Sequence, residues 1–69
     1  MEAIDIINQV AKNNSSDIDV SDIQDIVYWN LKENGFNPSK FGSSYIELDG
    51  QDFQFSRNNK KNNWSVRQL

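Results

Sequence analysis

The stretch SSYIELDGQDFQF, residues 43–55, decides the fold because it carries the pattern of a β-hairpin. Asp49-Gly50 separates two runs in which apolar and polar residues alternate, and this dipeptide favours a two-residue turn between antiparallel strands. With that turn, Ile46 lies opposite Phe53, and a shift of one residue would expose the aromatic side chains. The face of the hairpin that is expected to turn inward comprises Ile46, Leu48, Phe53 and Phe55.

The residues after the hairpin extend the sheet. RNNKKNN, residues 57–63, predicts a turn, and WSVRQL, residues 64–69, predicts a third strand with Trp64 and Val66 facing inward. The segment NPSKFG, residues 37–42, does not show whether it adds a further strand.

Two helices are expected before the sheet. EAIDIINQVAKNN, residues 2–14, has apolar residues along one side at helical spacing. DIQDIVYWNLKEN, residues 22–34, follows a Ser21–Gln24 capping box and precedes Gly35, which suits the left-handed end of a helix. The prediction is one α+β domain, residues 1–69, with two helices on one face of a three-stranded antiparallel meander, in the order α-α-β-β-β.

Composition excludes several kinds of site. The chain has no cysteine and no histidine, so zinc sites built on either residue and nucleophiles paired with histidine are absent. No apolar run approaches the roughly 20 residues that span a bilayer. We therefore expect a cytoplasmic protein that is not an enzyme, has no cofactor or metal, and makes no contact with a membrane.

Charge is unevenly distributed along the chain. Residues 1–35 hold seven acidic and two basic residues, a net charge of −5, whereas residues 36–69 hold three and five, a net charge of +2. The aspartates in DIDVSDIQD, residues 17–25, begin like a calcium loop, but Asp22 stands where that loop needs glycine and Tyr28 where it needs glutamate. Solvation and the helix N-terminus explain these aspartates better. An acidic helix N-terminus that imitates phosphate spacing is the alternative.

Three aromatic residues are candidates for binding a partner: Tyr28, Trp29 and Tyr45. Tyr28 and Trp29 flank the apolar stripe of the second helix, with Tyr28 expected to be the more interior, and Tyr45 falls on the outer face of the sheet. They either seal the fold or anchor an unknown protein partner. A weak homodimer that uses an exposed aromatic residue of the second helix or a sheet edge is also expected.

The basic C-terminal region raises a second hypothesis. Its cations could follow a phosphate backbone while Trp64 stacks on a base, as in the wing of a winged helix. The acidic helix at residues 22–34 would repel a nucleic acid, however, and a solvated turn explains the asparagines and lysines better. The candidate nucleic-acid-binding residues are Arg57, Lys60, Lys61, Trp64 and Arg67.

The composition resembles that of short proteins from Bacillus prophages of the SPbeta type, since it has ten asparagines, seven isoleucines and five lysines against two arginines. The resemblance implies a small phage-derived protein. The leading expectation is an interaction or regulatory module, and the alternative is an accessory protein that binds nucleic acid through residues 57–67.

Overall fold

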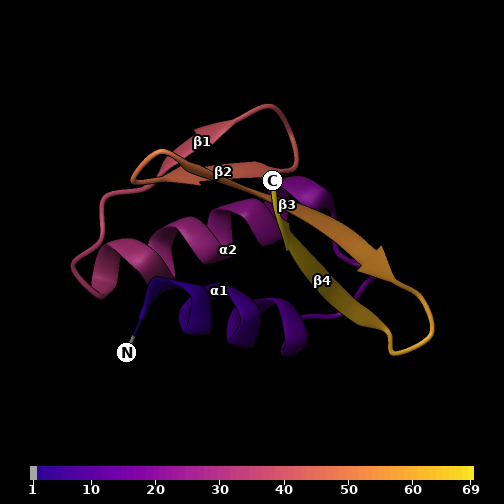
Figure 1. Ribbon diagram of the computed structural model, residues 1–69. Coiled ribbons are helices and arrows are strands. Elements are labelled where there is room, and N and C mark those ends of the chain that lie inside the picture. Colours follow the sequence, from indigo (N-terminus) through magenta and orange to yellow (C-terminus); the bar gives the residue numbers. More distant parts are fainter. Residues whose placement is uncertain (1) are drawn as a thin grey trace.

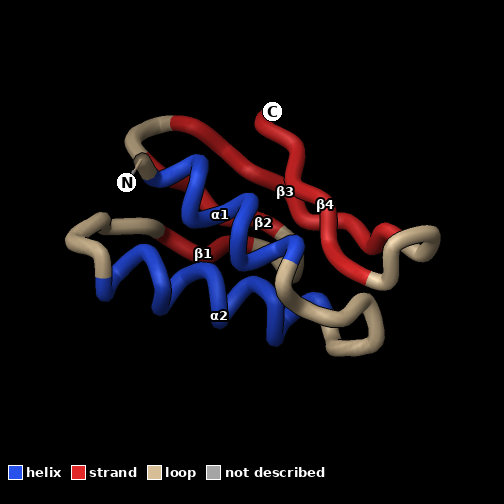
Figure 2. Tube along the Cα trace, turned by 90° about the horizontal axis from the view of Figure 1, so that it is seen from below, coloured by secondary structure: helices blue, strands red, loops and turns tan. Residues whose placement is uncertain are grey.

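The computed structural model describes residues 2–69, which form two helices and one antiparallel sheet with the strand order β1-β2-β3-β4 (Figure 1). Seen from the helix side, both helices cover one face of the sheet, with α1 towards β4 and α2 beneath β1 and β2 (Figure 2). The elements are α1 (Ala3–Lys12), α2 (Val20–Glu33), β1 (Ser39–Phe41), β2 (Tyr45–Leu48), β3 (Gln51–Asn58) and β4 (Asn63–Gln68).

The hairpin formed by β2 and β3 has the predicted register. Ile46 pairs with Phe53, and Asp49 and Gly50 have φ angles of 52° and 80°, as a type I′ turn requires. The Glu47 carboxylate accepts a hydrogen bond of 3.2 Å from the Gly50 N–H, which ties the turn to the strand before it.

The sheet has four strands, so the prediction of three was wrong. The additional strand, β1, pairs with β2 through Lys40 opposite Ile46. It spans three residues and every one of them is exposed, so no alternation of apolar and polar residues could reveal it in the sequence. The α+β class and the placement of both helices before the sheet are confirmed.

The end of α2 was predicted correctly and its beginning was not. Gly35 has a φ of 87°, and the Phe36 N–H donates to the Leu31 carbonyl over 3.0 Å, which is the expected Schellman arrangement. The capping box is wrong, because α2 begins at Val20 after Asp19 and no side chain caps it. Gln24 instead turns inward, towards the sheet.

The connection between β3 and β4 is shorter than the predicted turn at residues 57–63. Arg57 belongs to β3 and lies opposite Trp64, and Asn58 pairs with Asn63, so only four residues connect the strands. Asn62 takes the left-handed φ of 56° that asparagine tolerates. The asparagines on each side thus extend the ladder instead of ending it.

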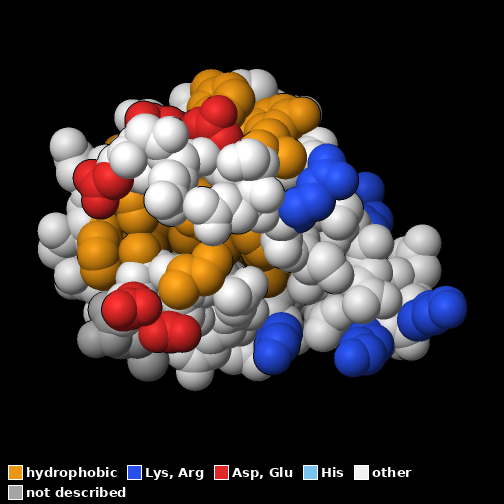
Figure 3. Space-filling model, viewed as in Figure 1, with side chains coloured by type: hydrophobic (Ala, Val, Ile, Leu, Met, Phe, Trp, Pro, Cys, Tyr) orange, Lys and Arg blue, Asp and Glu red, His pale blue; other side chains and the backbone are white. Residues whose placement is uncertain are grey.

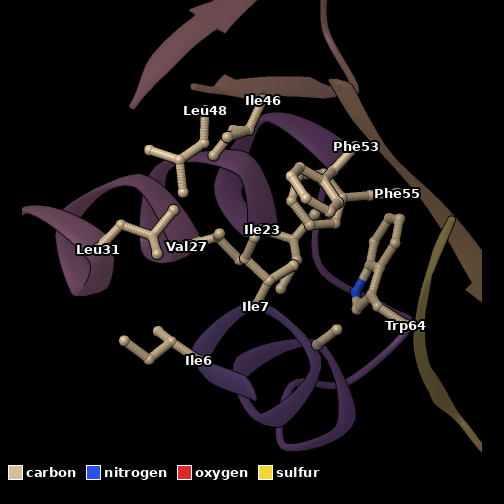
Figure 4. Packing of buried hydrophobic residues seen from close by; sticks show 11 residues of the cluster. Ile6, Ile7, Ile23, Val27, Leu31, Ile46, Leu48, Phe53, Phe55 and Trp64 are labelled. Carbon is tan, nitrogen blue, oxygen red and sulfur yellow. The ribbon is translucent and has the colours of Figure 1, made fainter. Parts of the chain in front are cut away.

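The core lies between the helices and the inner face of the sheet (Figure 4). Ile7 of α1 meets Ile23 and Val27 of α2, and Ile46 and Trp64 cover them from the sheet. All four residues expected on the inner face of the hairpin are buried. Neither helix in residues 2–69 combines the length and apolarity needed to cross a membrane.

Candidate protein-interaction surface

The edge strand β1 is flanked by aromatic side chains on both of its faces. Strand alternation turns Lys40 towards α2, where its Nζ lies 2.9 Å from the Asp25 carboxylate and 5.0 Å from the centre of the Tyr28 ring. Phe41 points to the outer face of the sheet and stacks on Tyr45, with ring centres 5.0 Å apart and an interplanar angle of 11°. β1 thus links an aromatic pair on the sheet to aromatic residues on α2.

Trp29 is the most exposed large apolar side chain of α2. It is 58% exposed, and its ring meets Tyr28 edge to face at 5.3 Å with an interplanar angle of 87°. Tyr28 is half-buried, so the predicted order of burial is correct. The ammonium groups of Lys40 and Lys32 lie 5.0 and 6.0 Å from the centre of the Tyr28 ring. Tyr28 therefore covers one side of the indole, and the rest of the indole is accessible.

The turn between β1 and β2 is fixed from inside the protein by Gln24. This side chain is 6% exposed, and its Nε2 donates to the Tyr45 carbonyl over 2.8 Å and more weakly to the carbonyls of Gly42 and Phe41 at 3.3 and 3.4 Å. Gly42 has a φ of 57°, and a β-carbon there would lie 3.2 Å from the Tyr45 ring. A glycine at this position lets the stacked aromatic pair rest against the turn.

We name these residues the Trp29 surface: Asp25, Tyr28, Trp29, Lys40, Phe41 and Tyr45. The side chains around it on α2 are mainly acidic, because Asp22 and Glu33 lie one or two turns from Trp29 along the exposed side of the helix. Lys32, three residues after Trp29, is the exposed cation of this helix. On the face of the molecule that Figure 3 shows, acidic groups gather on one side and basic groups on the opposite side.

Two of the five candidate nucleic-acid-binding residues form part of the fold. The Arg57 Nε donates to the Ser16 carbonyl over 2.8 Å, its Nη2 donates to the Ile18 carbonyl over 3.0 Å, and its guanidinium lies 4.8 Å from the centre of the Trp64 ring. Trp64 is 2% exposed and donates its indole N–H to the Ser15 carbonyl over 2.8 Å. This burial does not fit the predicted base-stacking role, and Arg57 is engaged with the α1–α2 loop.

The other three cations lie on different parts of the surface. Lys60 and Lys61 are exposed in the β3–β4 turn, whereas Arg67 lies on the outer face of the sheet and donates to the Gln54 side chain over 2.9 Å. Lys12, at the end of α1, lines a cleft of about 250 Å³ together with Lys61. The structure therefore brings Lys12 and Lys61 to one cleft, although they are far apart in the sequence.

The aspartates of residues 17–25 do not converge. Within residues 2–69, no three acidic side chains come close enough to hold a metal ion. Asp25 instead forms an ion pair with Lys40.

Sequence reasoning missed Phe41, Lys40 and Gln24, which together build the side of the molecule around β1. Phe41 and Tyr45 stand on either side of a Gly-Ser-Ser connection, and this spacing was the available signal for a second hairpin with a stacked aromatic pair. No local pattern marks Gln24, because its partners lie 17 to 21 residues further along the chain.

Comparison of the chain with protein-family models, with curated proteins and with solved structures finds no significant match. Inference about function therefore depends on the geometry of this chain.

Proposed function

We propose that this protein is a non-enzymatic interaction module that binds another protein through the Trp29 surface. The observation that carries the proposal is the exposure of Trp29, 58%, on a helix whose other large apolar side chains are buried or half-buried. Tryptophan is enriched among the residues that dominate binding energy at protein interfaces. Phe41, 42% exposed, adds a second apolar contact across β1.

The fixed geometry of this surface favours binding. Gln24 holds the β1–β2 turn, and the Lys40–Asp25 ion pair of 2.9 Å connects β1 to α2. Side chains that are already ordered lose less conformational entropy when a partner docks, so more of the interaction energy appears as affinity.

The charges around Trp29 indicate the chemistry of the partner. Asp22 and Glu33 are exposed on the same helix and outnumber its one exposed lysine, Lys32. Lys40 of β1 is already paired with Asp25. A complementary partner has an apolar pocket for the indole and basic residues around the rim of that pocket. The compositional resemblance to SPbeta-type prophage proteins supports a regulatory role in a bacterial cytoplasm.

A pull-down from nuclease-treated bacterial lysate tests the proposal. The wild-type protein is expected to retain a protein partner, and Trp29→Ala is expected to weaken retention by about 30-fold, because loss of a binding hot spot costs about 2 kcal/mol. Replacing both Lys60 and Lys61 with alanine is the control, since these residues lie in the β3–β4 turn, outside the Trp29 surface. Equal retention by wild type and Trp29→Ala would contradict the proposal.

Nucleic-acid binding is the second candidate, favoured by Lys12 and Lys61 at one cleft and by exposed Lys60 in the adjoining turn. With few phosphate contacts and with Trp64 buried, such binding would be weak and salt-sensitive, on the order of 10⁻⁴ M. The same pull-down, run in parallel on lysate without nuclease, separates the two functions. Retention that disappears with nuclease, or with the Lys60 and Lys61 substitutions, supports the second.

A further inference from the structure

The two edges of the sheet differ in the backbone groups that they leave unpaired. Leu48 and Gln51 flank a type I′ turn and therefore form a hydrogen-bonded pair. Hydrogen-bonded and non-hydrogen-bonded pairs alternate from this point, so this pair determines which residues of β1 bond to β2. By this alternation, Lys40 is the β1 residue whose N–H and C=O point outward. Pro38, two residues earlier, has no N–H. Shortness, proline and a central lysine are the features that protect an edge strand from pairing.

The β4 edge lacks this protection. The Leu69 N–H donates to the Asp52 carbonyl over 2.9 Å, and this bond fixes the alternation between β3 and β4. Trp64, Val66 and Gln68 therefore direct their N–H and C=O groups away from β3. No loop backbone within residues 2–69 hydrogen-bonds these groups. A row of such groups is a template for another strand.

A cleft of about 250 Å³ lies beside β4, between this strand and α1. Half-buried Val66 and exposed Asn8 both line it. Figure 1 shows β1 and β4 at opposite sides of the sheet, so a strand added to β4 would not reach the Trp29 surface.

We propose that the β4 edge binds the β4 edge of a second copy of this chain, antiparallel and related by a twofold axis at Val66. In this register Val66 faces Val66 of the partner subunit, and Trp64 faces the partner's Gln68. The ladder gains about six backbone hydrogen bonds. The joined sheet then ends at a protected β1 on each side, which gives a closed dimer and not a growing fibre.

The side of α1 next to this edge has charges that complement themselves. Asp5, Asn8 and Lys12 recur at helical spacing and are all exposed, and Asn8 and Lys12 line the cleft beside β4. A twofold axis near Val66 turns the second α1 antiparallel to the first. Each Lys12 then lies beside the partner's Asp5, with Asn8 near the axis. In a twofold dimer the same surface of both subunits meets, so each charge must lie opposite a complementary charge of that surface across the axis. Asp5 and Lys12 on either side of Asn8 meet this condition.

Sedimentation equilibrium of the full chain from about 10 μM to 1 mM, together with amide exchange, tests the β4 ladder. The wild type is expected to dimerise, with amide exchange at Trp64, Val66 and Gln68 slowing as concentration rises. Val66→Pro removes an outward-pointing N–H, which a sheet edge tolerates, together with the packing of the half-buried valine on the core. It is expected to weaken the dimer by about tenfold or more. A monomer throughout the range, or a dimer indifferent to Val66→Pro, would overturn the proposal.

A charge exchange keeps the test decisive if Val66→Pro fails to fold. Asp5→Lys and Lys12→Asp should each weaken the dimer several-fold at low salt, and the double variant should recover most of that loss. The matched control is Asp22→Lys, which makes the same charge change in the first turn of the other helix. The same dissociation constant for wild type, both single variants and the control would contradict the proposal. Since Trp29 lies outside this contact, Trp29→Ala should leave the dimer intact, so failure of this inference is distinguishable from failure of the proposed function.

Discussion

Replacing Gln24 with methionine should destabilise the protein well beyond the usual effect of a substitution on a helix. Methionine has similar length and helix propensity, so the change removes the amide while largely preserving the packing. The Nε2 has two hydrogens and serves three carbonyls, with one good bond of 2.8 Å to Tyr45 and two long ones of 3.3 and 3.4 Å. The Tyr45 bond therefore dominates the expected loss.

The magnitude follows from this geometry. A net hydrogen bond contributes about 1 kcal/mol, and a buried carbonyl left without its donor costs about 1–3 kcal/mol. We expect Gln24→Met to lower the free energy of unfolding by about 2 kcal/mol, a large part of the ~3–5 kcal/mol available to so small a domain. With a urea m-value of about 1 kcal/mol/M, the midpoint should fall by about 2 M.

Urea unfolding monitored by circular dichroism measures this change. Gln9→Met is the matched control, because Gln9 is exposed on α1, and it should change stability by less than about 0.5 kcal/mol. Amide exchange at residues 41–45 should also accelerate in Gln24→Met, since the β1–β2 turn loses its internal anchor. A loss below about 0.5 kcal/mol for Gln24→Met would refute the anchoring role.

Three further substitutions test the fold, and one tests the basic turn. Phe53→Ala should cost about 3–5 kcal/mol in a urea melt because it empties the core opposite Ile46; a loss below ~1 kcal/mol would contradict the register. Trp64→Phe should cost about 1–2 kcal/mol in the same assay, through loss of the indole hydrogen bond. Gly50→Ala should cost about 1 kcal/mol of thermal stability, since its φ of 80° strains any β-carbon. Alanine at both Lys60 and Lys61 should leave the melting temperature unchanged, because both side chains are exposed.

The parts of the fold that the sequence predicts are those with short-range signals. The Asp49-Gly50 turn sets the hairpin register, and Gly35 ends α2, because each needs a backbone conformation that few residues adopt. The apolar periods on either side agree with these signals, so the local and tertiary preferences coincide.

The parts that the sequence could not predict depend on contacts between distant residues. β1 is three exposed residues without apolar alternation, and Gln24, which fixes the adjoining turn, lies 17 residues before its nearest partner in this region. Ser21 and Gln24 have the spacing of a capping box, but no side chain caps α2, and the Gln24 amide donates to carbonyls of the β1–β2 turn.

The structural roles of Arg57 and Trp64 in the basic C-terminal region could not be predicted for the same reason. Arg57 and Trp64 form hydrogen bonds with carbonyls of the α1–α2 loop, 39 to 49 residues away, so two residues that read as a nucleic-acid contact stabilise the fold. The sequence placed Trp29 correctly at the boundary of the apolar stripe. It did not identify Phe41 as a candidate, because it did not detect β1.

The measurement that tests the proposed function most directly is an NMR titration of the ¹⁵N-labelled chain with the protein retained in the pull-down. We predict shifts of the Trp29 indole N–H and of the Lys40 and Phe41 amides, with Lys60 and Lys61 unchanged. Shifts centred on Lys60 and Lys61, with the Trp29 indole unaffected, would contradict the assignment of the Trp29 surface as the binding site.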